Sequence, residues 1–153
     1  MLNLDNLHDF ILTAKAATYI GDGHSAPSCR PASHDLAYQA GDYQYLDSYF
    51  GGSDFIGEEI VYLQGSPVWG MNYYGVLREP EVISAAEVGR MIKDSLSLMY
   101  REGRFLGGWL HTQGELTYHD TSQGDLTYFS GREWIEKDGQ VLYELVYHGG
   151  MIR

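Results

Sequence analysis

The segment YQYLDSYFGGSDFIGEEIVYLQGSPVWGMNYYGVL, residues 43–77, contains three strand-like runs in which carboxylates stand among aromatic residues. Gly65-Ser66 separates the second and third runs, and glycine at the first position of a two-residue turn is typical of a tight β-hairpin. Counting outward from this turn places Glu58 opposite Tyr73. The segment therefore predicts consecutive antiparallel strands.

A four-residue loop over residues 51–54 would bring Asp47, on the first strand, opposite Glu58 on the second. Two carboxylates that face each other across a sheet repel, so the pair requires compensation by an arginine, a proton, a metal ion or a ligand. The same face carries tyrosines and a tryptophan, and aromatic side chains with a polar atom are typical of small-molecule pockets. We therefore expect this face to form a concavity lined by the carboxylates and the aromatic side chains.

The predicted ligand-binding residues come from this face and from a long loop over residues 21–35, which is rich in glycine, serine and proline. An arginine in the loop has a planar guanidinium group that could reach the carboxylates or hold a substrate anion. The alternative is that helices cover the face and the arginine is a structural ion-pair partner. The six predicted residues are Arg30, Tyr45, Asp47, Glu58, Trp69 and Tyr73.

A second hairpin is predicted at Asp138-Gly139, a dipeptide that strongly favours a two-residue turn. Regular pairing from this turn places Glu133 opposite Glu144, on one face with His148. Two carboxylates near a histidine can perform acid–base chemistry once their pKa values differ. The alternative is that both glutamates lie in solvent or pair with basic residues of the same hairpin.

A helix is expected over residues 5–17, where apolar residues recur at helical spacing. Ser84 and Glu87 form a capping-box pattern before a second apolar stripe, which reaches about Met99. The other runs alternate as strands do. We therefore predict an α+β fold in a single domain, residues 1–153, with an N-terminal helix, one mid-chain helix and a mostly antiparallel, strongly curved sheet built from hairpins.

The composition argues against several classes of protein. A net charge of −11 disfavours binding to nucleic acid, which requires clustered lysine and arginine. No apolar run approaches the ~20 residues of a membrane span, and no signal-peptide pattern begins the chain. The single cysteine, Cys29, excludes an internal disulfide framework and favours a reducing cytoplasm. Compact metal-ligand spacings and glycine-rich phosphate loops are absent, so we expect no metal and no cofactor.

Several segments together resemble a bacterial family of unknown function: SCRPAS at 28–33, GDYQYLDSYFGG at 41–52, GEEIVY at 57–62, VWGMNYYG at 68–75 and VYHGG at 146–150. The resemblance extends from Phe10 to Gly150. Members of this family look like cytoplasmic domains that stand alone or are fused behind a helix-turn-helix DNA-binding domain, which implies a sensing role. No activity is attached to the family, so the resemblance implies no catalytic residues.

Two main functions are therefore open. The first is a non-enzymatic domain that senses a small ligand, or a partner, through an aromatic and acidic pocket. The second is a small acid–base enzyme that uses Asp47 with Glu58, or Glu133 and Glu144 with His148. A third is a structural partner-binding protein with an exposed apolar patch. The expected partners are a small-molecule ligand and, in one alternative, a second copy in a homodimer; neither nucleic acid nor a membrane is expected.

Overall fold

The computed structural model describes residues 2–20 and 25–153. These residues form helices and strands in the predicted α+β combination. In chain order the elements are α1 (Leu4–Lys15), the π-helical turn η1 (Ala16–Ile20), β1 (Ser25–Ala26), β2 (His34–Ala40), β3 (Tyr43–Gly51), β4 (Phe55–Leu63), β5 (Ser66–Leu77), α2 (Ala85–Arg101), β6 (Trp109–Gln113), β7 (Leu116–Asp125), β8 (Tyr128–Lys137) and β9 (Gln140–Met151).

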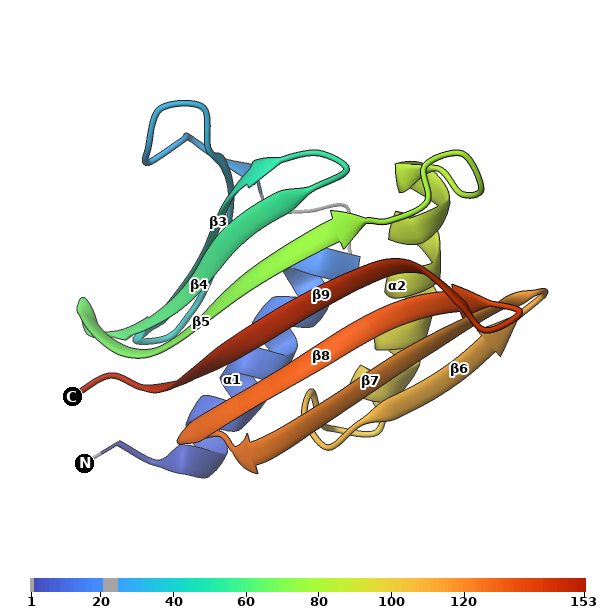
Figure 1. Ribbon diagram of the computed structural model, residues 1–153. Coiled ribbons are helices and arrows are strands. Elements are labelled where there is room, and N and C mark those ends of the chain that lie inside the picture. The colour runs from blue at the N-terminus through green and yellow to red at the C-terminus, as the bar shows by residue number, and fades with distance from the viewer. Residues whose placement is uncertain (1, 21–24) are drawn as a thin grey trace.

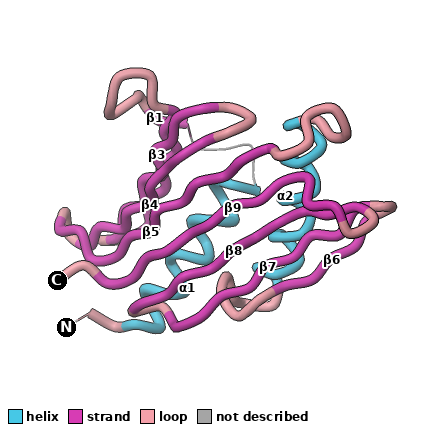
Figure 2. Tube along the Cα trace, viewed as in Figure 1, coloured by secondary structure: helices cyan, strands magenta, loops and turns pink. Residues whose placement is uncertain are grey.

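The strands of the described residues form one antiparallel sheet of nine strands, in the order β1-β2-β3-β4-β5-β9-β8-β7-β6. The sheet is curled but not closed, and both α-helices lie on the same side of it (Figure 1). Figure 2 shows the two helices behind the continuous run of strands. We call the face toward the helices the inner face and the opposite one the outer face. The predicted curved, mostly antiparallel sheet with two helices is confirmed.

Capping side chains determine where the helices begin. Asn3 Oδ1 accepts hydrogen bonds from the backbone amides of Asp5 and Asn6, at 2.9 and 3.0 Å, and so caps the start of α1. The predicted capping box of Ser84 and Glu87 is present at the start of α2, which ends at Arg101. Gly103, with φ of 77°, lies just beyond that end, where a left-handed residue commonly stops a helix.

The sheet consists of two halves that meet where β5 pairs with β9. In the first half α1 precedes β2 to β5, and in the second half α2 precedes β6 to β9. Residues of the two halves match at a sequence offset of 73 or 74: Tyr45 with Tyr118, Asp47 with Asp120, Glu59 with Glu133 and Tyr73 with Tyr147. The fold is therefore an internal repeat of a helix followed by four strands.

The turn of the β4–β5 hairpin contains Gln64-Gly65 and not the predicted Gly65-Ser66. Both turn residues have positive φ, 50° and 81°, as a type I′ turn requires. The displaced turn alone would move the partner of Glu58 by two residues, but a bulge between Val61 and Tyr62 restores one. Glu58 therefore lies opposite Asn72, and its predicted pairing with Tyr73 is wrong by one residue.

A shorter loop shifts the β3–β4 pairing in the same way. Gly51 pairs with Phe55, so the connecting loop has three residues where four were predicted. Asp47 therefore lies opposite Glu59, and the prediction that it faces Glu58 is wrong. Since neighbours along a strand point to opposite faces, Glu59 lies on the inner face with Asp47, and Glu58 lies on the outer face.

The β8–β9 hairpin has the predicted turn but not the predicted register. Asp138-Gly139 closes it with φ values of 51° and 79°, but a bulge follows, and Glu133 pairs with Leu145. Glu133 is therefore buried on the inner face, whereas Glu144 lies on the outer face, where Arg132 Nη2 is 2.8 Å from its Oε2. The predicted side-by-side placement of the two glutamates is wrong.

Candidate functional site

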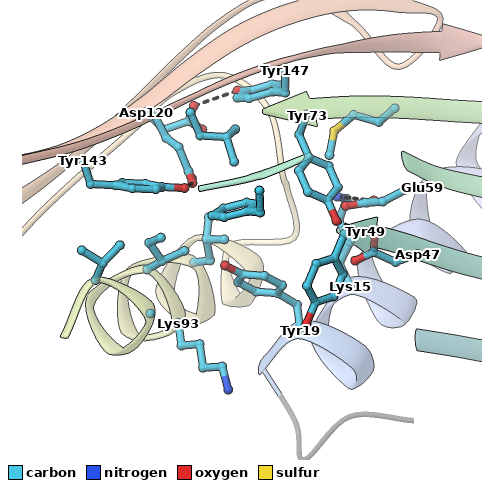
Figure 3. Close-up of a pocket in the computed structure, with 18 of the residues that line it drawn as sticks. Lys15, Tyr19, Asp47, Tyr49, Glu59, Tyr73, Lys93, Asp120, Tyr143 and Tyr147 are labelled. Carbon is cyan, nitrogen blue, oxygen red and sulfur yellow. Dashed lines mark hydrogen bonds and ion pairs between the residues drawn. The ribbon is translucent and has the colours of Figure 1, made fainter. Parts of the chain in front are cut away.

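A cavity of about 620 Å³ lies between the inner face of the sheet and the helices. Its apolar lining comes from strands and from one side of α2, including Phe55, Val88, Ile92 and Leu145. Tyrosines and buried carboxylates supply the rest of the wall (Figure 3). The two carboxylate pairs of this wall belong to the two halves of the repeat.

The first pair is Asp47 and Glu59, which lie directly opposite each other on β3 and β4. Lys15, at the end of α1, places its Nζ 2.6 Å from Glu59 Oε2, and both side chains are buried. The Tyr73 hydroxyl donates to Asp47 Oδ1 at 2.6 Å. One lysine therefore compensates two carboxylates, and the second carboxylate has only a neutral hydrogen-bond donor.

The second pair is Asp120 and Glu133, which lie opposite each other on β7 and β8. The Tyr147 hydroxyl donates to Asp120 Oδ1 at 2.7 Å. Glu133 accepts from the hydroxyls of Tyr118, at 2.5 Å, and Tyr143, at 3.1 Å. Among the residues that the structure describes, no lysine or arginine forms an ion pair with either carboxylate.

Glycines make room for the two tyrosines that reach these pairs. A Cβ atom at Gly57 would lie 2.3 Å from the Tyr73 hydroxyl oxygen, and one at Gly131 would lie 2.3 Å from that of Tyr147. No side chain fits at such a distance, so each tyrosine ring crosses its neighbouring strand only because the residue there is glycine. The repeat thus preserves the Asp, Glu, Tyr and Gly positions together.

Burial controls the ionisation of these carboxyl groups. It raises the pKa of Asp47 to about 7, assisted by the Glu59 charge and opposed by the Tyr73 hydrogen bond. Burial likewise raises the pKa of Glu133 to about 7 and that of Asp120 to about 6. These groups therefore exchange protons near neutral pH, and a cation brought into the cavity would favour their charged forms.

Two of the six predicted site residues, Asp47 and Tyr73, line this cavity together. Tyr45 lies on the inner face but is 2% exposed and belongs to the core. Trp69 is fully buried, and its Nε1 donates to the Leu126 carbonyl oxygen at 3.1 Å. The prediction that these four residues surround one concavity is therefore correct for two of them and wrong for Tyr45 and Trp69.

The remaining two predicted residues lie away from the cavity. Glu58 is on the outer face because of the one-residue shift in register. Arg30 donates to Ser48 Oγ at 3.1 Å and stacks its guanidinium 4.9 Å from the centre of the Phe50 ring. Its predicted placement around the same concavity is wrong, because Ser48 points to the face of β3 opposite to the cavity-lining neighbours Asp47 and Tyr49.

Sequence reasoning missed Lys15, Asp120 and the repeat, although the sequence contains signals for each. Lys15 follows Ile11 by four residues and therefore lies on the buried side of the helix. The pattern Tyr-x-Asp occurs at 45–47 and 118–120, and Phe-x-Gly-x-Glu occurs at 55–59 and 129–133. Comparing these patterns would have identified both carboxylate pairs.

The described residues contain no group of three or more His, Cys, Asp or Glu side chains that could hold a metal ion. No helix in residues 2–20 and 25–153 is long and apolar enough to cross a membrane.

Comparison with known proteins identifies the family of the chain. Residues 47–152 match the model of the domain of unknown function DUF5680, and the chain belongs to this family. The match covers β4 to β9 completely, and with them both carboxylate pairs, whereas Lys15 lies outside it. No curated protein and no solved structure matches the chain.

Proposed function

We propose that this chain is a non-enzymatic domain that binds and senses a small molecule in the cavity between the sheet and the helices. The observation that supports this most directly is the cavity itself, whose volume of about 620 Å³ suits a small organic ligand. Its apolar wall offers binding area, and its tyrosines and carboxylates offer orienting contacts. A cytoplasmic location accords with the single cysteine. The fusion to helix-turn-helix domains that the family resemblance implies accords with a sensing role.

Gly89 provides a direct test, because it lines the cavity from the second turn of α2. A Cβ atom added there meets nothing within 4 Å, and the helical backbone at this position accommodates a leucine without strain. Gly89→Leu should therefore fill part of the cavity and leave the fold intact. Ala86→Leu, on the exposed side of the same helix, is the matched control.

The measurement is a titration with benzyl alcohol, followed in ¹H–¹⁵N NMR spectra. We expect the native chain and Ala86→Leu to show chemical-shift changes at the amides of cavity-lining residues in the strands and in α2. Gly89→Leu should lose these changes. Undiminished binding by Gly89→Leu, or chemical-shift changes only at residues that do not line the cavity, would contradict the proposal.

An acid–base enzyme is the second candidate, favoured by the pKa values near 7 of Asp47 and Glu133. An enzyme changes its ligand, whereas a sensor releases it unaltered. Mass spectrometry of compounds recovered after incubation therefore separates the two candidates. Conversion that is abolished by both Asp47→Asn and Glu133→Gln would favour the enzyme; unaltered recovery favours the sensor.

A further inference from the structure

We infer that the Asp120–Glu133 end of the cavity binds the ammonium group of an organic amine, in the role that the Lys15 ammonium group has at the Asp47–Glu59 end. The inference rests on the proposed ligand-binding function and specifies the chemical class of the ligand. It follows from the internal repeat and from one position at which the two halves differ.

The strands of the two halves bring equivalent groups to the cavity. Asp47 faces Glu59 as Asp120 faces Glu133, and in each half a tyrosine hydroxyl donates to the aspartate. Those tyrosines, Tyr73 and Tyr147 in turn, are direct partners across β5 and β9 at the centre of the sheet. Each half therefore presents a similarly built carboxylate pair.

The helices of the two halves also match, at a sequence offset of 81. Each α-helix lies against the first strands of its own half, α1 against β2 and β3, and α2 against β6 and β7. The cavity-side and core residues of the helices correspond in order: Leu7 with Val88, Ile11 with Ile92, Ala14 with Ser95, Thr18 with Met99, and Tyr19 with Tyr100. The same offset relates Lys15 to Leu96, and both residues line the cavity.

The second half therefore lacks the lysine that the first half has. Lys15 Nζ lies 2.6 Å from Glu59, whereas Asp120 and Glu133 accept side-chain hydrogen bonds only from tyrosine hydroxyls among the described residues. Lys15 and Arg104 lower the pKa of Asp120 from a distance, but neither forms an ion pair with it. Two buried carboxylates without a paired cation attract one from outside and repel an anion.

The surroundings indicate the rest of the ligand. The side chains of Tyr19 and Tyr100 line the cavity, and no hydrogen bond joins either hydroxyl to another described residue. Aromatic faces attract ammonium groups, and the apolar side of α2 offers Val88 and Ile92 to a hydrocarbon body. Figure 3 shows Lys93 extending away from the other labelled side chains, so it does not supply the missing cation. A primary amine with an apolar or aromatic body fits these groups.

The test uses three probes of nearly equal size that differ in charge: benzylamine, benzyl alcohol and benzoate. Binding to the full chain is measured by NMR titration at about pH 8, where the carboxyl groups are ionised. We expect benzylamine to bind roughly tenfold more tightly than benzyl alcohol, and benzoate to bind most weakly.

Leu96→Lys supplies the missing ammonium group from the chain itself, and Leu96→Met is its neutral comparison of similar length. Relative to Leu96→Met, Leu96→Lys should weaken benzylamine binding roughly tenfold and change benzyl alcohol binding by less than about threefold. If Leu96→Lys does not fold, Glu133→Gln should give the same selective loss of benzylamine, compared with Glu58→Gln on the outer face.

The outcomes separate the two proposals. Selective loss of benzylamine in Leu96→Lys or Glu133→Gln supports the inference. The inference is overturned if benzyl alcohol or benzoate binds as tightly as benzylamine or more tightly, or if neither variant weakens benzylamine binding. Either result leaves the ligand-binding function standing. Absence of binding by all three probes overturns both.

Discussion

Asp47 ionises at a higher pH in the folded chain than in the unfolded one, because it is buried opposite a second carboxylate. Its pKa is about 7, against an ordinary value of 3.8. Between these values the unfolded chain releases the proton first, so the folded state loses stability as the pH rises. Asp120 and Glu133, with pKa values of about 6 and 7, act in the same direction. The chain should therefore be more stable near pH 5 than near pH 8.

Asp47→Asn tests this dependence at one residue. The amide keeps an acceptor for the Tyr73 hydroxyl but cannot ionise, so the variant should melt several degrees above the native chain at about pH 8 and not above it at about pH 5. Thermal denaturation at both pH values is the measurement. Glu58→Gln, the outer-face control, should show no such difference, and an Asp47→Asn effect that is independent of pH would refute the account.

The Lys15–Glu59 pair is the second residue-scale test. Both side chains are buried, so Lys15→Met leaves a carboxylate without its cation and should destabilise the fold by about 3–5 kcal/mol in urea denaturation. The double variant Lys15→Met with Glu59→Gln should recover part of that loss. Lys137→Met removes an exposed pair with Glu115 and should change stability little. Equal effects of the two lysine variants would contradict the buried role of Lys15.

At the scale of single elements, α2 forms one wall of the cavity, and its start depends on Ser84. The Ser84 side chain accepts from the Glu87 amide at 3.2 Å, so Ser84→Ala should cost about 1 kcal/mol in denaturant unfolding. Ser97→Ala is the control, because that hydroxyl bonds to the Asp94 carbonyl within the helix. A loss no larger than that of the control would show that the cap does not stabilise α2.

Periodicity and capping patterns predicted the elements of this fold well, because they depend on neighbouring residues. The Ser84 capping box and the Asp138-Gly139 turn are examples. The registers were predicted less well. A β3–β4 loop of three residues where four were expected, and a bulge in the β8–β9 hairpin, each shift the pairing by one residue. Since one residue reverses the faces of a strand, Glu58 was expected where Glu59 lies.

At the scale of the whole molecule, the repeat relates the two ends of the cavity. The sequence predicts Asp47 and Tyr73 of one half as site residues, because their patterns are local. Local patterns do not place Lys15 or Asp120 in the site, because the contacts that bring them to the cavity join distant segments, such as α1 with β4. The difference between Lys15 and Leu96 emerges only when the halves are compared, and it makes one end of the cavity the expected place for a ligand cation.

A crystal structure of the chain grown with benzylamine at about pH 8 tests this claim most directly. The account predicts density for the probe between the sheet and α2, with its ammonium nitrogen about 3 Å from a carboxylate oxygen of Asp120 or Glu133. A cavity filled by side chains, a probe bound only on the outer face, or an ammonium group turned away from both carboxylates would contradict it.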